Sequence, residues 1–182
     1  MLEALITSKT RIKLLLKFFL NSSNTAYLRG LEPEFGESTN AIRVELNRFE
    51  DADLLVSTTQ GNKKYYQANT THPLFPEIHK LLLKHIGLDK VIDKVINKLG
   101  HLSEVYLVGE LAKGKNSKVI DLWFVGQDLD KKYLMNLAEK AEELIKRKIR
   151  YIVLDNKELT EFLKNKGDNE LLLVWKSEGE ND

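Results

Sequence analysis

The stretch from Ser38 to Tyr66 constrains the fold most, because it joins a helical pattern to the pattern of a β-hairpin. Three apolar residues recur at steps of four and three, which places them on one helical face: Ile42, Leu46 and Phe49. Two β-prone runs follow, 54–59 and 63–68, and Gly61 and Asn62 between them tolerate the positive φ angles of a tight turn. The stretch therefore predicts a helix that packs by one face and leads into a hairpin.

Polar residues occupy a second face of this helix and the tip of the hairpin. We interpret the helix and hairpin as a unit that reads DNA. The residues predicted to contact the edges of the bases in the major groove are Asn40, Arg43 and Asn47. Those predicted nearer the phosphates are Ser38, Thr39 and Arg48. The hairpin residues predicted along the DNA backbone or in the minor groove are Gln60, Asn62, Lys63 and Lys64. The alternative is that these faces are merely exposed to water.

With the run TAYLRGLEPEFGESTNAIRVELNRFEDADLL and the following GNKKYYQANTTHPLFPEIHKLL, the first half of the chain resembles bacterial winged helix-turn-helix repressors of the ArsR-like class. The features that carry the resemblance are Leu28, Gly36, Leu46, Leu54, Leu55 and the wing GNKKYY. It implies three helices and a β-hairpin wing that bind duplex DNA. One residue departs from the pattern, because such proteins usually carry glycine at the position of Asp53, so we expect a different helix-to-wing corner.

Two further helices are predicted before this stretch. The first starts at the capping residue Ser8 and presents an apolar stripe made of Ile12, Leu15, Leu16 and Phe19. Its lysines repeat every four residues on what we predict to be a basic outer face: Lys9, Lys13 and Lys17. The second helix is predicted from Thr25 to Phe35, and Gly36 makes the turn that follows it.

A helix is also predicted after the hairpin, because Pro73 and Pro76 precede a stripe at helical spacing. The stripe consists of Ile78, Leu81, Leu82 and Ile86. In the proteins that the first half resembles, such a helix commonly pairs two subunits, so a homodimer is predicted. The alternative, that the stripe covers the chain's own core, has equal weight.

The second half alternates helices and strands, which predicts a small mixed α/β sheet with helices packed on it. Helices are expected at 88–99, 129–147 and 156–165, and strands at 104–108, 119–125, 149–154 and 170–175. The fold class of the whole chain is therefore α+β, with a winged helix-turn-helix domain before a small α/β domain.

The stretch VYLVGELAKGKNSKVIDLWFVG, 105–126, resembles the signature of small nucleotidyltransferase domains. In that family a glycine-led turn holds nucleotide phosphates, two aspartates on the next strand bind a divalent metal, and a neighbouring strand supplies a third carboxylate. The positions that match this turn and strand, which we expect to form a vestigial ligand pocket, are Gly109, Glu110, Lys113, Gly114 and Asp121.

Several of these positions depart from the family's chemistry. Glu110 replaces a hydroxyl residue, Lys113 replaces arginine, and Val119 stands where the first aspartate belongs. No acid falls in the region of the third carboxylate, near 150–152, although Asp155 lies just beyond it. A divalent cation that bridges phosphates needs several oxygen ligands, and a carboxylate beside a triphosphate repels it. We therefore predict no catalytic residue, no metal, no cofactor and no enzymatic activity.

Composition excludes several classes of protein. The 182 residues are 42% hydrophobic and 30% charged, which is typical of globular proteins, and without cysteine there is no disulfide or thiolate metal site. The longest apolar runs are too short to span a bilayer, and no secretory signal is recognisable, so a cytoplasmic protein without membrane contact is predicted. The net charge of +1 indicates no polyanion partner by itself, so DNA binding has to depend on where the charges lie.

The predicted organisation is a DNA-binding domain at 1–72, a linker or dimerisation helix at 73–87, a degenerate nucleotidyltransferase-like domain at 88–176 and a disordered acidic tail at 177–182. The predicted function is transcriptional regulation, with the second domain kept for assembly or for sensing a small-molecule or nucleotide effector. One alternative is an active nucleotidyltransferase that its winged helix targets. Another is an adaptor that docks a protein and never touches DNA.

Overall fold

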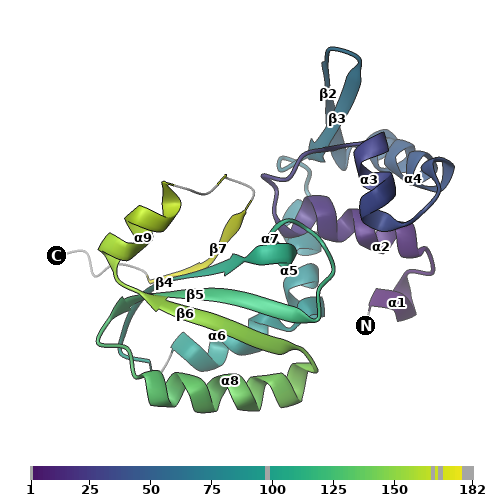
Figure 1. Cartoon of the computed structure of the whole chain (residues 1–182). Coiled ribbons are helices and arrows are strands. Elements are labelled where there is room, and N and C mark those ends of the chain that lie inside the picture. The colour runs from purple at the N-terminus through teal and green to yellow at the C-terminus, as the bar shows by residue number, and fades with distance from the viewer. Residues whose placement is uncertain (1, 97–98, 165–166, 168–169, 178–182) are drawn as a thin grey trace. The chain divides into compact units, whose positions relative to one another are not determined.

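A computed structural model of the chain describes residues 2–96, 99–164, 167 and 170–177. The chain divides into two compact units, Met1–His85 with Gly114–Asn116, and Ile86–Lys113 with Ser117–Asp182 (Figure 1). Of the predicted acidic tail only Ser177 is described, and its amide donates to the carbonyl of Ser103; residues 178–182 lie outside the described part. In the described residues no helix is both long and apolar enough to cross a bilayer.

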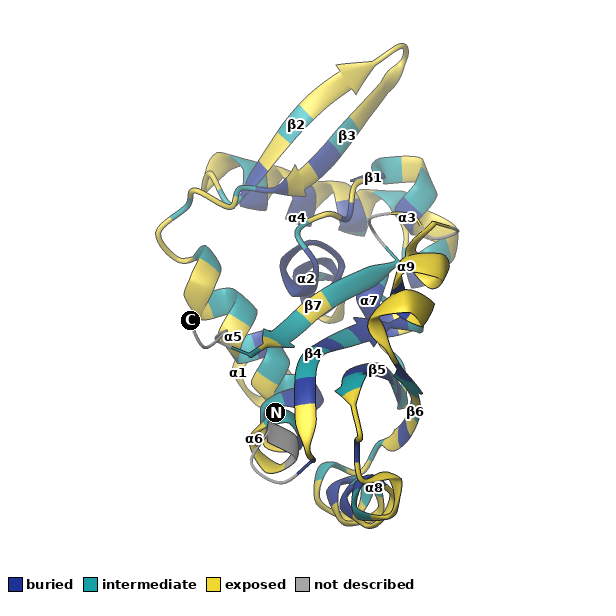
Figure 2. Ribbon diagram, turned by 90° about the vertical axis from the view of Figure 1, so that its left-hand side faces the viewer, coloured by how far each residue is buried: buried dark blue, intermediate teal, exposed yellow. Residues whose placement is uncertain are grey.

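The first unit consists of helices and a small three-stranded antiparallel sheet. Its elements are α1 (Leu2–Leu5), α2 (Lys9–Leu15), the π-helical η1 (Leu16–Leu20), β1 (Ala26–Tyr27), α3 (Leu28–Phe35), α4 (Thr39–Asp51), β2 (Leu55–Gln60), β3 (Lys63–Ala68) and α5 (Phe75–Ile86). The sheet has the order β1-β3-β2, and β2 and β3 form the hairpin that the sequence predicts around Gly61. Most of the hairpin is exposed (Figure 2).

The helix predicted to begin at Thr25 begins at Leu28 instead. Ala26 pairs with Tyr66 and Tyr27 pairs with Tyr65, so these residues form a short edge strand before the helix. The predicted basic outer face of α2 and η1 is also wrong in part, because Lys17 is only 8% exposed and its ammonium bonds the carboxylate of Glu34 at 3.0 Å. Contacts with residues distant in the sequence therefore determine both where α3 begins and that Lys17 is buried.

The corner between α4 and the hairpin depends on Asp53. Its φ of 56° lies in the left-handed region, which glycine adopts most easily and which aspartate tolerates better than most residues. The side-chain amide of Asn69 donates to the Asp53 carbonyl over 2.8 Å. The corner thus places a residue other than glycine in the left-handed region, which glycine would adopt with less strain.

The second unit is a four-stranded mixed sheet with helices on both faces. Its elements are α6 (Leu88–Ile96), β4 (His101–Val108), α7 (Gly109–Ala112), β5 (Val119–Gln127), α8 (Lys131–Ile145), β6 (Lys148–Leu154), α9 (Asn156–Leu163) and β7 (Leu171–Lys176). The strand order is β6-β5-β4-β7, in which β5 and β6 are parallel and the other pairs are antiparallel. Residues 97–98 and 165 of two predicted helices lie outside the described part.

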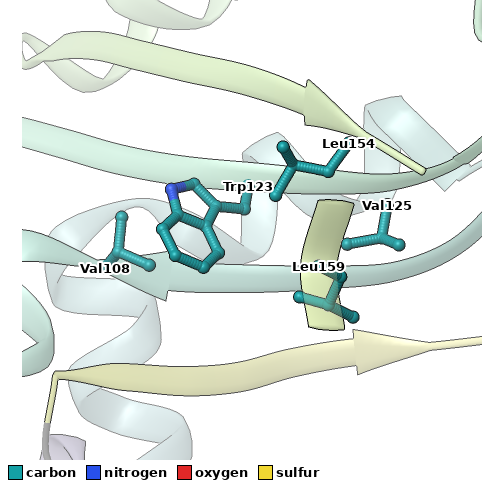
Figure 3. Close-up of a cluster of buried hydrophobic side chains, with 5 residues drawn as sticks. All are labelled: Val108, Trp123, Val125, Leu154 and Leu159. Carbon is teal, nitrogen blue, oxygen red and sulfur yellow. The ribbon is translucent and has the colours of Figure 1, made fainter. Parts of the chain in front are cut away.

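The two faces of this sheet are covered differently. Helices α6 and α8 lie along one face and α9 lies on the other (Figure 1). On the α9 face a buried cluster joins three strands to the helix, and it consists of Val108, Trp123, Val125, Leu154 and Leu159 (Figure 3). The alternation of helices and strands and the mixed sheet are compatible with a nucleotidyltransferase-like fold.

Candidate functional site

The start of α4 is fixed by its own cap. The hydroxyl of Ser38 accepts a hydrogen bond from the amide of Ala41 at 3.2 Å, which satisfies one of the unpaired amides of the first turn. The next hydroxyl, that of Thr39, donates to the carboxylate of Glu32 at 2.7 Å. A carboxylate beside Thr39 disfavours a phosphate at that position, whereas Ser38 remains exposed.

The outer face of α4 carries the predicted base-reading residues. Asn40, Arg43 and Asn47 are all exposed, whereas Ile42 and Leu46 on the inner face are at most 1% exposed. Arg43 makes no ion pair within the described part of the chain. Val44, which is 40% exposed, lies on the same outer face between Asn40 and Asn47 and was not predicted from the sequence. The sequence signal for Val44 is its spacing, because it lies four residues after Asn40 and three before Asn47, on the same face of the helix.

Glu45 is a buried carboxylate that pairs with two arginines, Arg11 and Arg48. It is 6% exposed, and its carboxylate accepts hydrogen bonds from Arg11 at 2.9 and 3.3 Å and from Ser8 at 3.0 Å. Arg48 also reaches it at 3.3 Å, so this predicted phosphate contact is partly engaged within the protein. Burial acts to raise the pKa of Glu45, but the bonds from Arg11 and Ser8 outweigh it and hold the pKa below its usual value.

The hairpin presents all four of its predicted DNA-contacting residues as exposed side chains: Gln60, Asn62, Lys63 and Lys64. The two lysines are held differently. Lys64 bonds the carboxylate of Glu50 at 2.7 Å, and this bond raises the pKa of Lys64 and lowers that of Glu50. The ammonium of Lys63 lies 4.4 Å from the centre of the Tyr27 ring, a cation–π contact that leaves its charge uncompensated.

The second unit holds a different candidate, which we call the carboxylate pocket. It has a volume of about 240 Å³, and its lining includes Gly109, Asp121, Trp123, Arg150 and Ile152. Asp121 on β5 lies opposite Arg150 on β6, and the guanidinium bonds both carboxylate oxygens at 2.6 and 3.0 Å. The region predicted to lack an acid therefore supplies a cation, and the bond to Asp121 raises the pKa of Arg150.

Gly109 makes room for the Asp121 carboxylate. Its φ is 71°, and a Cβ at this position would lie 2.6 Å from Asp121 Oδ2, which is closer than any real contact. Any other residue would therefore be strained in its backbone and would collide with the carboxylate. The positive φ and the lack of space for a Cβ therefore both favour glycine at the turn between β4 and α7.

The other predicted pocket residues do not line the carboxylate pocket. Glu110 is exposed on α7, Lys113 pairs with Glu170 at 3.2 Å, and Gly114 belongs to the first compact unit. The alternative acid, Asp155, caps α9 by accepting from the amides of Lys157 and Glu158, both at 2.8 Å. It follows Leu154, which pairs with Val125 four residues along β5 from Asp121.

The residues of the carboxylate pocket do not fit the divalent metal that the family resemblance implies. Asp121 is bound by a guanidinium, Val119 stands at the first acid position, and Arg150 occupies the region of the third. Among the described residues no three Asp, Glu, His or Cys side chains gather to hold a metal ion.

The predicted dimerisation stripe on α5 divides into two parts. Leu82 and Ile86 are 0% and 1% exposed, so they are buried within the single chain. Ile78 and Leu81 are only half-buried, and the exposed Leu74 precedes them. The homodimer stays a prediction.

No family model matches the chain, and no curated protein matches it. Among solved structures, one described as a candidate nucleotidyltransferase from Sulfolobus solfataricus is 24% identical, with 56% of this chain and 87% of that chain covered and a TM-score of 0.38. A toxin-antitoxin structure with AMP-PNP is 19% identical, with 50% and 73% covered and a TM-score of 0.39. A mutant of the toxin-antitoxin MntA-HpeT is 18% identical, with the same coverage and a TM-score of 0.39.

These structures correct one prediction. The eroded nucleotidyltransferase signature predicted that the chain is not an enzyme, and the nucleotidyltransferase described among the similar structures contradicts it, so that prediction is not retained. The identities below 25% and the TM-scores below 0.5 assign neither an activity nor a partner to this chain.

Proposed function

We propose that the first unit is a winged helix that binds duplex DNA, with α4 in the major groove and the β2–β3 hairpin beside it, and that the chain regulates transcription. The observation that carries the proposal is the outer face of α4, where Asn40, Arg43, Val44 and Asn47 are exposed together. Arginine and asparagine side chains pair in bidentate fashion with guanine and adenine edges, and a valine methyl suits the methyl group of thymine.

The charges around α4 also support DNA binding. The acid within its first two turns, Glu45, is buried and bound by Arg11 and Arg48. In the last turn Glu50 is bound by Lys64, whereas Asp51 is exposed and outside any described ion pair; Glu37 before the helix is bound by Lys13 at 2.7 Å. Compensated carboxylates repel a phosphate backbone less than free ones, and Arg43 and Lys63 remain as cations outside any described ion pair.

The test is selection of duplexes from a random pool by the full chain, followed by affinity measurements on the selected sequence. Arg43→Ala should weaken binding to that sequence by about 1–3 kcal/mol and should weaken binding to unrelated duplexes less. Lys132→Ala is the matched control, since Lys132 is exposed on α8 in the other unit. A pool that shows no enrichment, or an Arg43→Ala variant that binds like the parent, would reject the proposal and would favour the adaptor.

A second candidate function is nucleotidyl transfer by the second unit, and the carboxylate pocket is the observation that favours it. Gly109, at the amino end of α7, and Asp121 meet there, and both match positions of the nucleotidyltransferase signature that the sequence resembles. The assay incubates the full chain with labelled nucleoside triphosphates and acceptors that include the chain itself, with and without magnesium or manganese, because the residues of this pocket form no metal site among the described residues. Label transfer that Asp121→Asn abolishes and the control Asp51→Asn preserves would support this function. No transfer to any acceptor would count against it.

A further inference from the structure

A second pocket lies in the first unit, beside the hairpin, and has a volume of about 350 Å³. It exists because β1 is only two residues long and pairs with β3 solely at Ala26↔Tyr66 and Tyr27↔Tyr65. After Tyr27 the chain turns into α3, so Lys63 and Lys64 on β3 have no neighbouring strand on that side among the described residues. The start of α3 and this uncovered edge of β3 form the walls.

The lining of this pocket is basic. Arg29, Lys63 and Lys64 contribute three cations, Asn62 contributes an amide, and none of the described lining residues is an acid. Glu50 compensates only Lys64. Arg29 is exposed and makes no ion pair within the described residues, so two positive charges are left uncompensated at the wall.

The tyrosines hold one of these charges in place. Tyr27 packs against Tyr65 edge to face, with ring centres 5.4 Å apart, and its ring lies 4.4 Å from the ammonium of Lys63. A cation that stays at the wall before a ligand arrives loses less conformational entropy when the ligand binds. The arrangement is therefore preorganised for an anion.

We propose that this pocket binds a phosphate group, with Arg29 and Lys63 as its charge partners and Asn62 as an amide donor. Guanidinium groups match phosphate oxygens in bidentate geometry, and an ammonium adds a point charge. The phosphate belongs either to the DNA backbone, in which case the inference rests on the proposed function and extends its contacts to Tyr27 and Arg29, or to a free phosphorylated small molecule.

The first arm of the test measures free phosphate. Inorganic phosphate and AMP are titrated into the ¹⁵N-labelled full chain, and the amide signals of Arg29, Asn62 and Lys63 are followed by NMR. We expect these signals to shift, and we expect Arg29→Gln to weaken the response about ten-fold or more, because it removes a charged hydrogen bond. Tyr27→Leu keeps every charge but removes the ring under Lys63, so it should weaken the response less. Lys132→Gln is the control, and its response should equal that of the parent.

The second arm measures DNA. The affinity for a duplex of arbitrary sequence is measured against salt concentration, and a variant that no longer binds one of the phosphates should have a slope of log K against log salt that is shallower by about 0.9. A shallower slope in Arg29→Gln together with competition by free phosphate assigns the pocket to the DNA backbone. A parental slope together with AMP-induced shifts assigns it to a free phosphorylated ligand.

The failure of this inference differs from the failure of the proposed function. If the parent binds no duplex but phosphate still shifts the pocket amides, DNA binding is rejected and the phosphate pocket stands. A different outcome would overturn the pocket inference and leave DNA binding intact. In that outcome the parent binds DNA, the variants Arg29→Gln and Lys63→Gln keep the parental salt slope, and neither phosphate nor AMP shifts these amide signals.

Discussion

Arg150 on β6 lies directly opposite Asp121 on β5 and donates to both oxygens of its carboxylate, over 2.6 and 3.0 Å. Neighbouring parallel strands bring the two residues together although 29 positions separate them in the chain. The guanidinium is largely exposed, with 72% of its side chain accessible, whereas only 17% of the Asp121 side chain is accessible. This pair fixes the charge of the carboxylate pocket.

The pair predicts how the pocket responds to a metal ion. Arg150→Asp places two carboxylates opposite each other on neighbouring strands, an arrangement that suits a hard divalent cation. We expect this variant to bind Mn²⁺ about ten-fold or more tightly than Arg150→Asn, which removes the cation without adding a carboxylate. Electron paramagnetic resonance of free Mn²⁺ measures the difference, and adding Asp121→Asn should abolish the gain. Equal Mn²⁺ affinity of the Asp and Asn variants would contradict the role given to this pair.

Val44 predicts a preference for thymine at one position of a selected DNA site. Burying one methyl group contributes about 0.8 kcal/mol, so replacing one particular thymine by uracil should lower affinity roughly four-fold. In Val44→Ala the same replacement should have little effect. The measurement replaces each thymine of the selected duplex in turn. Leu144→Ala is the control, because Leu144 is a similarly exposed apolar residue, 49% accessible, on α8 in the other unit. A DNA-binding parent that is indifferent to every uracil would contradict the role of Val44.

The bonds that Glu45 accepts predict that the free energy of unfolding of the first unit falls at acid pH. The folded pKa of Glu45 is lowered, so in the window between the folded and unfolded pKa values the unfolded chain binds more protons, and stability rises with pH. The contribution is complete above the unfolded value of about 4.3 and is lost as the pH falls through the folded pKa. Glu45→Gln should cost about 1–3 kcal/mol at neutral pH and should flatten the pH dependence below it. Both tryptophans, Trp123 and Trp175, lie in the second unit, so urea unfolding is followed by the amide signals of α2 and α4. An unchanged pH profile would contradict this role.

Asp53 predicts a stabilising substitution. A residue other than glycine in the left-handed region costs roughly 1–2 kcal/mol, with aspartate at the low end. Asp53→Gly should therefore raise the free energy of unfolding of the first unit by about 0.5–1 kcal/mol, and Asp53→Val should lower it. The bond from Asn69 goes to the backbone carbonyl of Asp53, so neither substitution removes it. The same urea experiment measures both, and a less stable glycine variant would contradict the strain argument.

Much of the geometry of α4 and of the β2–β3 hairpin could be predicted from the sequence. The period of Ile42, Leu46 and Phe49 identifies the inner face of α4, and therefore also the outer face with Asn40 and Arg43. The cap at Ser38 and the turn at Gly61 follow from the conformational preferences of single residues. These features are local, because helical period and turn chemistry depend on residues a few positions apart.

The charge partners depended on the tertiary structure. Lys17 follows Lys13 at the four-residue spacing that predicted an exposed basic face. In the structure Lys17 is buried and bound to Glu34. No local sequence pattern distinguishes Lys17 from Lys9. The pocket beside the hairpin likewise depends on the pairing of Ala26 and Tyr27 with β3, and a strand of two residues leaves no recognisable pattern in the sequence.

The sequence by itself determined the architecture of each half of the chain: a helical half with a hairpin, and a half in which helices and strands alternate in a mixed sheet. Periodicity and turn residues indicate both, because they depend on residues that are close together in the chain. Only the tertiary structure decided which side chains meet across strands, as Arg150 meets Asp121 and Lys63 meets Tyr27. The physical reason is register. A shift of one residue along β6 would turn Arg150 to the other face of the sheet, and register is set by the packing of whole elements, not by the residues next to Arg150.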